Sequence, residues 1–84
     1  MSPTPARVAF FTRTGCHLCD EARPVVEAVC RRTGEAFTEH DVDADAGLRR
    51  LYTDKVPVVT VDGTVVDFWR VDERRLQERL TARQ

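Results

Sequence analysis

The sequence lacks both a long apolar run and a large net charge. No stretch approaches the roughly 20 apolar residues that a membrane-spanning helix needs, and the formal net charge is −1. These absences argue against a transmembrane protein and against binding of nucleic acid or an anionic membrane through bulk charge. The segment from Met1 to Pro5 is short and polar and lacks the apolar core of a signal peptide, so we expect a cytoplasmic protein.

Cysteine is scarce, and the chain is short. Three cysteines are an odd number, which fits poorly with the disulfide framework of a secreted protein. In a reducing compartment, a Cys-x-x-Cys pair is more often catalytic or metal-binding than a permanent cross-link. A chain of 84 residues supports only one small core, so we expect a single domain over residues 1–84.

The spacing of apolar residues predicts alternating strands and helices. Residues 7–12 form an apolar, aromatic-rich strand that ends at Thr14-Gly15, and residues 16–32 follow a helical pattern closed by Gly34. Pro24 lies inside this helix. Five further features are predicted: a strand over 36–42, a helix over 46–52 capped by Asp43 or Asp45, a strand over 58–61, an Asp62-Gly63 hairpin leading to a strand over 65–68, and a last helix capped by Asp72.

The order of these elements is βαβαββα, which indicates an α/β fold. Strands separated by helices pair in parallel through right-handed crossovers, and the hairpin adds an antiparallel edge. The sequence therefore predicts a four-stranded mixed sheet with helices packed on it.

The feature with the clearest chemistry is Cys16-His17-Leu18-Cys19. Cys16 falls at a strand-to-helix turn, where unpaired N–H groups and the helix dipole stabilise a thiolate, the nucleophilic form of cysteine. Arg13 could add positive charge on the same side. Cys19 comes one turn later and deeper in the helix, so we predict that Cys16 attacks a substrate disulfide and Cys19 resolves the mixed disulfide. His17 either tunes the pair or is an exposed helix residue, and the pattern does not decide between them.

A Cys-x-x-Cys pair could also be half of a metal site. Cys30 lies three turns beyond Cys19, on the order of 16 Å away along a regular helix, so it cannot share a metal with the pair within one chain. Cys30 is expected to be a buried core residue. No resident metal or other cofactor is therefore predicted.

Taken together, the motifs resemble those of the thioredoxin superfamily, and within it the small glutaredoxin-like proteins of bacteria. The segment Phe11-Thr12-Arg13-Thr14-Gly15-Cys16-His17-Leu18-Cys19 is similar to the glutaredoxin pattern of an aromatic, a hydroxyl residue, a base and Cys-x-x-Cys. Pro24 matches the helix proline of thioredoxins, and Val56-Pro57 matches the family's cis-proline site. The resemblance implies the three-layer thioredoxin-like fold and a dithiol thiol–disulfide oxidoreductase, with Val56 offering backbone hydrogen bonds to an extended peptide or to glutathione.

The sequence departs from glutaredoxins before the last helix. Glutaredoxins usually carry a Gly-Gly pair there, but this chain has Phe68 and Trp69, although Asp72 matches the family's acidic residue. Bulky side chains would obstruct the close approach of a ligand. The expected partner is thus a protein disulfide or another low-molecular-weight thiol, and glutathione is less favoured. We expect a monomer; the alternative is a metal or iron–sulfur carrier in which two chains pool their cysteines.

Overall fold

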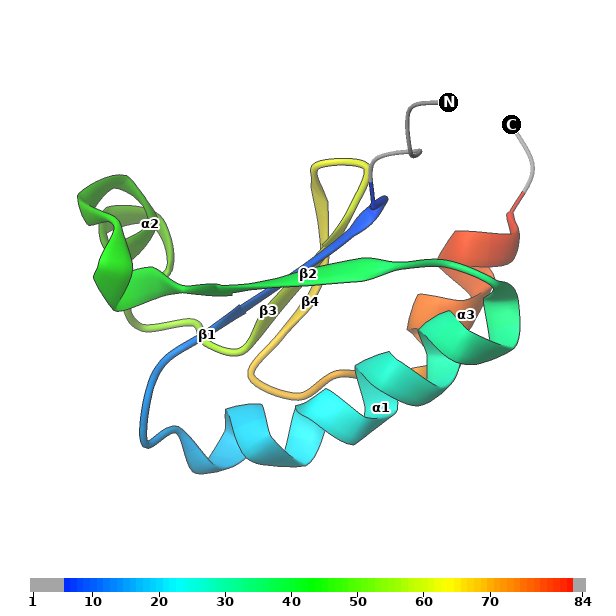
Figure 1. Ribbon diagram of the computed structural model, residues 1–84, viewed down its shortest axis with the longest axis horizontal. Helices are drawn as coiled ribbons and strands as arrows, with labels where there is room; N and C mark the ends of the chain where they lie inside the picture. Colours follow the sequence, from blue (N-terminus) through cyan, green and yellow to red (C-terminus); the bar gives the residue numbers. More distant parts are fainter. Residues whose placement is uncertain (1–5, 83–84) are drawn as a thin grey trace.

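The computed structural model describes residues 6–82, and the elements follow the predicted order with one extra 3₁₀ turn. Figure 1 shows them along the chain. They are β1 (Val8–Thr12), α1 (His17–Thr33), β2 (Phe37–Asp41), the 3₁₀ turn η1 (Val42–Ala44), α2 (Ala46–Tyr52), β3 (Val58–Val61), β4 (Thr64–Phe68) and α3 (Glu73–Thr81).

The four strands form one mixed sheet in the order β2-β1-β3-β4. β1 pairs in parallel with β2, as expected for strands joined by the crossover helix α1, and it pairs antiparallel with β3. β3 and β4 form the hairpin predicted at Asp62-Gly63, with an irregularity in the ladder between Val59 and Thr60. The prediction of a four-stranded mixed sheet is therefore confirmed.

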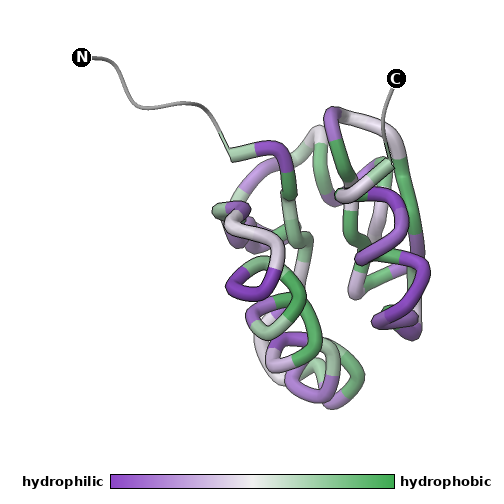
Figure 2. The backbone as a smooth tube through the Cα atoms, turned by 90° about the vertical axis from the view of Figure 1, so that its right-hand side faces the viewer, coloured by the Kyte–Doolittle hydropathy of each residue, from purple (hydrophilic) through white to green (hydrophobic). Residues whose placement is uncertain are grey.

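The thioredoxin-like α/β fold is also confirmed, with two helices on one face of the sheet and the third helix in contact with the opposite face at one end. α1 and α3 lie side by side on one face, and α2 lies at one end of the sheet (Figure 1). Because side chains alternate along a strand, Phe10 joins the core under α1 and α3, whereas Phe11 contacts Tyr52 of α2 with ring centroids 4.9 Å apart. In Figure 2 the helical coils carry both hydrophilic and hydrophobic residues, as expected for helices with one side in the core.

The helix ends follow from local capping. Cys16 is the N-cap of α1, Asp45 caps α2 and Asp72 caps α3, each through a side chain that accepts a backbone N–H. Gly34 ends α1 in the left-handed conformation, as predicted. β2 is one residue shorter at each end than the predicted strand over 36–42. At its C-terminal end the reason is that Val42 turns into η1 and is buried there.

Within residues 6–82, no helix combines the length and the apolar character needed to cross a bilayer.

Candidate redox site

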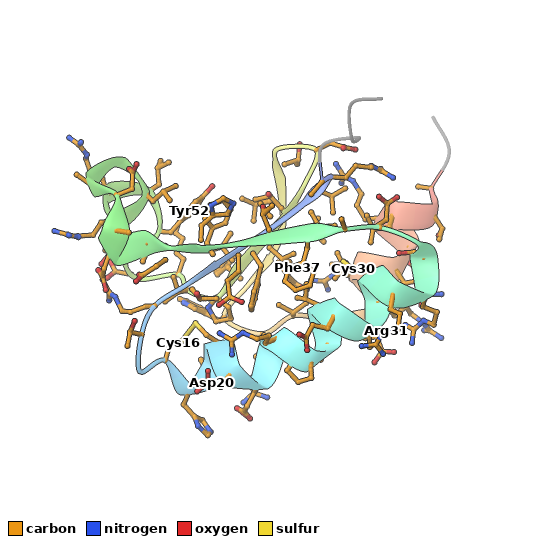
Figure 3. The ribbon with its side chains drawn as sticks, viewed as in Figure 1. Cys16, Asp20, Cys30, Arg31, Phe37 and Tyr52 are labelled. Carbon is orange, nitrogen blue, oxygen red and sulfur yellow. A yellow bond between two sulfur atoms is a disulfide. The ribbon has the colours of Figure 1, made fainter. Side chains whose placement is uncertain are left out.

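Cys16 and Cys19 form a disulfide at the N-terminus of α1, where Figure 3 shows Cys16 at the start of the helix. Their Cα atoms lie 5.2 Å apart. Cys16 has extended backbone angles, and its Sγ accepts the backbone N–H of Cys19 at 3.1 Å. Gly15, at φ +77°, makes the turn between β1 and α1 that brings Cys16 to this position. The sulfur that would carry negative charge therefore accepts a first-turn helix N–H, one of those that have no carbonyl partner within the helix.

The two cysteines differ in exposure. Cys16 is partly exposed, whereas Cys19 is completely buried. Cys16 is thus the more accessible sulfur, and Cys19 is positioned one helical turn away, already in bonding contact with it. His17 lies between them in sequence, but 87% of its side chain is exposed, and its Nε2 is 3.5 Å from Glu21. Whether His17 tunes the pair stays a prediction.

Val56-Pro57 lies at the same end of the sheet as the cysteine pair. Val58 pairs with Phe11 in the antiparallel ladder, so the two residues before Val58 extend past the end of β1 toward the redox turn. The Val56–Pro57 peptide bond is cis. Among the described residues, no hydrogen bond engages the N–H or the C=O of Val56, so this backbone edge is free for a ligand.

Arg13 is paired with a partner that the sequence did not reveal. Its guanidinium forms a two-pronged ion pair with Asp43, at 2.9 and 3.0 Å, and donates to the Thr53 hydroxyl at 2.8 Å. This pairing lowers the pKa of the Asp43 carboxyl below its ordinary value. Arg13 thus ties the redox turn to η1 and to the segment before Val56, and Asp43 offsets much of its charge.

The residues that replace the family's glycines lie beside the cysteine pair. A groove of about 810 Å³ is formed by Leu18 of the Cys-x-x-Cys segment and by the stretch from β4 into α3. Phe68 and Trp69 are 42% and 53% exposed on it. The Asp72 carboxylate accepts the N–H of Arg75 as a helix cap, so its predicted contact with substrate stays a prediction.

Cys30 lies near the far end of α1, away from Cys16 (Figure 3), and is 2% exposed. Burial raises the pKa of its thiol. It packs in the core as predicted. In the described part of the chain, no three His, Cys, Asp or Glu side chains gather as a metal-binding group.

Sequence reasoning missed a polar network next to the redox turn. Glu39 of β2 accepts two hydrogen bonds from Arg23 of α1, at 2.9 and 2.8 Å, and a third from the hydroxyl of Thr12, the buried last residue of β1. Arg23 also pairs with Asp20, one residue beyond Cys19. The hydrogen bonds from Arg23 lower the pKa of Glu39. The network joins the end of β1, the first turns of α1 and the sheet edge.

Replacing Glu39 by glutamine is expected to lower stability at pH 7 but not in acid. Because the pKa of Glu39 is lowered in the folded state, its contribution is present above the unfolded value of about 4.3 and is lost as the pH falls through the folded value. The loss at pH 7 should be at most about 1 kcal/mol, since both partners are one-third exposed. Urea unfolding at pH 7 and pH 3 measures it.

The control is Glu27→Gln, an exposed α1 residue that forms no ion pair in the described part of the chain. Its urea midpoint should match that of the wild type at both pH values. If Glu39→Gln lowered stability equally at pH 7 and pH 3, the charge of Glu39 would not be the cause.

Comparison with known proteins points to one family. Residues 7–81 match the family model described as glutaredoxin-like domain (DUF836). An uncharacterized protein of Mycobacterium tuberculosis is 34% identical over 76 residues, covering 84% of this chain and 78% of that one. Among solved structures, a structural-genomics target protein from X. campestris has a TM-score of 0.74 at 33% identity, covering 92% and 99% of the two chains. A mutant thioredoxin from Halobacterium salinarum has a TM-score of 0.65 at 30% identity, covering 92% and 75%.

Proposed function

The chain belongs to the glutaredoxin-like domain family, DUF836, in the thioredoxin superfamily, and we propose that it is a dithiol thiol–disulfide oxidoreductase. The observation that carries the proposal is the asymmetric pair: a partly exposed Cys16 capping α1 and a buried Cys19 bonded to it. A permanent structural cross-link would have little need of an exposed sulfur at a helix N-terminus. A redox pair needs one, because the thiolate must be both stabilised and reachable.

In the proposed reaction, the reduced protein transfers two electrons to a substrate disulfide. The Cys16 thiolate attacks one substrate sulfur, the substrate S–S bond breaks, and the other substrate sulfur leaves as a thiolate that takes a proton from water. Cys19 loses its proton and attacks Cys16, which releases the second substrate thiol and forms the Cys16–Cys19 disulfide. A thiol reductant then restores the dithiol by the reverse exchange.

The free edge at Val56 supports an extended substrate. The N–H and the C=O of Val56, which have no partner among residues 6–82, can pair with the backbone of a peptide lying beside the disulfide, as in strand addition. The cysteine of such a peptide would be held near Cys16. Arg13 supports the same arrangement indirectly, because its bonds to Asp43 and Thr53 hold the segment that leads to Val56.

Equilibration with redox buffers tests the proposal. The protein is incubated in mixtures of reduced and oxidised dithiothreitol or glutathione, quenched, and its free thiols are counted by mass spectrometry after alkylation. We expect a single two-electron transition from three free thiols to one, with Cys30 alkylated only after denaturation because it is buried. A pair whose oxidation state did not respond to the buffer would contradict the proposal.

A further inference from the structure

Trp69 lies beside the redox pair in a backbone conformation that residues other than glycine rarely adopt. Its φ is +67°, in the left-handed region that favours glycine. Three hydrogen bonds keep it there. Its backbone N–H donates to the carbonyls of Pro57 and Lys55, at 2.8 and 3.3 Å, and its indole Nε1–H donates to the carbonyl of Asp54 at 2.7 Å. Backbone strain of this kind persists only where surrounding contacts hold it, and it clusters at ligand sites.

These bonds place the indole ring next to the free Val56 edge. Asp54, Lys55 and Pro57 belong to the segment that contains Val56, so the Trp69 ring and this edge are held as one unit. Trp69 remains 53% exposed, and the Phe68 ring packs against it edge-on, with ring centroids 5.0 Å apart. An aromatic side chain that is already fixed loses little entropy when it binds a partner.

The groove surface continues from Trp69 to Leu18, which lies between the two cysteines in sequence. Leu18, inside the Cys-x-x-Cys segment, lines the same groove as Phe68, Trp69 and Val71. A substrate that reaches Cys16 and pairs with Val56 therefore passes this apolar wall. A large apolar side chain close to the substrate cysteine would remove the wall from water, which is favourable in proportion to the buried area.

The carboxylate of Asp67 lies at the polar end of the groove. Asp67, whose side chain is 12% exposed, accepts the backbone N–H of Asp72 and a hydrogen bond from the Arg75 guanidinium, both at 2.9 Å. Asp72 in turn uses its carboxylate to cap α3. A ligand carboxylate approaching the start of α3 would compete with Asp67 for these donors, and the carboxylates of Asp67 and Asp72 partly offset the charge of Arg70, which lines the same groove.

We propose that Trp69 is a specificity-determining residue, which selects an extended polypeptide carrying a large apolar side chain close to its disulfide cysteine over small anionic disulfides such as oxidised glutathione. This inference rests on the proposed function, because it concerns the substrate of that same reaction. It assigns the apolar wall of Leu18, Phe68, Trp69 and Val71 to the substrate's side chain and the Val56 edge to its backbone.

Single-turnover oxidation of the reduced protein tests the inference. The oxidants are two symmetric peptide disulfides, one with leucines and one with serines flanking the cysteine, and oxidised glutathione; each protein molecule becomes a disulfide and releases two thiols. The wild type should react about tenfold faster with the leucine peptide than with the serine peptide, the ratio expected if roughly one apolar side chain is partly buried. Trp69→Gly should bring this ratio close to one.

Two variants control the measurement. Trp69→Phe keeps an aromatic wall and should keep most of the leucine preference. Leu51→Ala removes an apolar side chain that is 63% exposed on α2, outside the groove, and should leave all three rates unchanged. If Trp69→Gly kept the full leucine preference, or Leu51→Ala lost it, the inference would be overturned.

Trp69 is the only tryptophan, so its fluorescence gives a readout that does not depend on a folded Trp69→Gly variant. In Cys19→Ser protein trapped as a mixed disulfide, the leucine peptide should shift the emission to shorter wavelength, while glutathione should not. Equal emission in the two trapped species, or equal wild-type rates with all three oxidants, would overturn the inference and leave the proposed function standing. No reaction with any oxidant would overturn both.

Discussion

Replacing Cys16 by serine is expected to lower the rate of disulfide exchange by roughly a thousandfold or more, because a serine hydroxyl stays protonated and cannot act as the nucleophile that a thiolate is. The structure makes this substitution mild in every other respect. Serine is itself a favoured N-cap residue, so its hydroxyl can accept the Cys19 N–H in place of Sγ and keep the first turn of α1 intact. The measurement is the reduction rate of a disulfide substrate under steady-state conditions with excess thiol reductant.

The matched variants separate the two roles of the pair. Cys19→Ser should still attack the substrate disulfide but should stop at the mixed disulfide, which accumulates at one equivalent and is visible by mass spectrometry of the intact protein. Cys30→Ala should retain wild-type exchange, since Cys30 is buried in the core away from the pair. Full activity in Cys16→Ser, or a mixed disulfide formed through Cys19 in that variant, would show that the nucleophile has been misassigned.

The sequence predicted the elements well where a local signal decides them. α2 begins and ends where predicted, because the Asp45 carboxylate accepts the Leu48 N–H and fixes its start. The hairpin at Asp62-Gly63 and the Asp72 cap of α3 are equally local. The position of Cys16 at a strand-to-helix turn needed only the change from strand to helix spacing. All of these depend on residues within four positions of one another.

The side-chain partners around the site could not be predicted in this way. Arg13 is separated by 30 residues from Asp43, and Arg23 by 16 residues from Glu39, so each pairing depends on how β2 and η1 lie against β1 and α1. A charged residue in a sequence carries no signal for which of many opposite charges it will meet. The expectation that Arg13 adds positive charge beside Cys16 stays a prediction, and the structure shows that its guanidinium is paired with Asp43.

The backbone conformation of Trp69 also could not be predicted from the sequence, for a different reason. A positive φ is expected at glycine or asparagine, and nothing in Phe68-Trp69-Arg70 indicates it. It arises because the carbonyls before β3 accept both the backbone and the indole N–H groups of Trp69. The sequence shows bulky residues where glutaredoxins usually carry glycines, but only the structure reveals the left-handed backbone conformation of Trp69.

Replacing Phe10 by alanine is expected to cost about 3–5 kcal/mol of the free energy of unfolding, as for other fully buried phenylalanines. Phe10 is completely buried at the centre of β1, meets Phe37 edge-on at 6.4 Å, and carries the Arg23 guanidinium 6.0 Å above its ring. A chain of this size has a total stability of roughly 4–13 kcal/mol. The expected loss is therefore roughly a quarter of the total stability or more, and the urea midpoint should be much lower.

Phe68→Ala is the matched control, because it removes the same side chain from the edge strand β4, where Phe68 is 42% exposed. Its cost should be about 1 kcal/mol, since little apolar area is lost from the interior. Equal costs for the two variants would mean that Phe10 does not anchor the core.

The position of Phe10 also bears on the redox site. β1 leads directly into the turn that presents Cys16, and the Phe10 side chain packs under the Arg23–Glu39 network. Loss of Phe10 should thus act mainly on the stability of the elements that hold the cysteine pair. The folded fraction should fall more than the exchange rate measured per folded molecule.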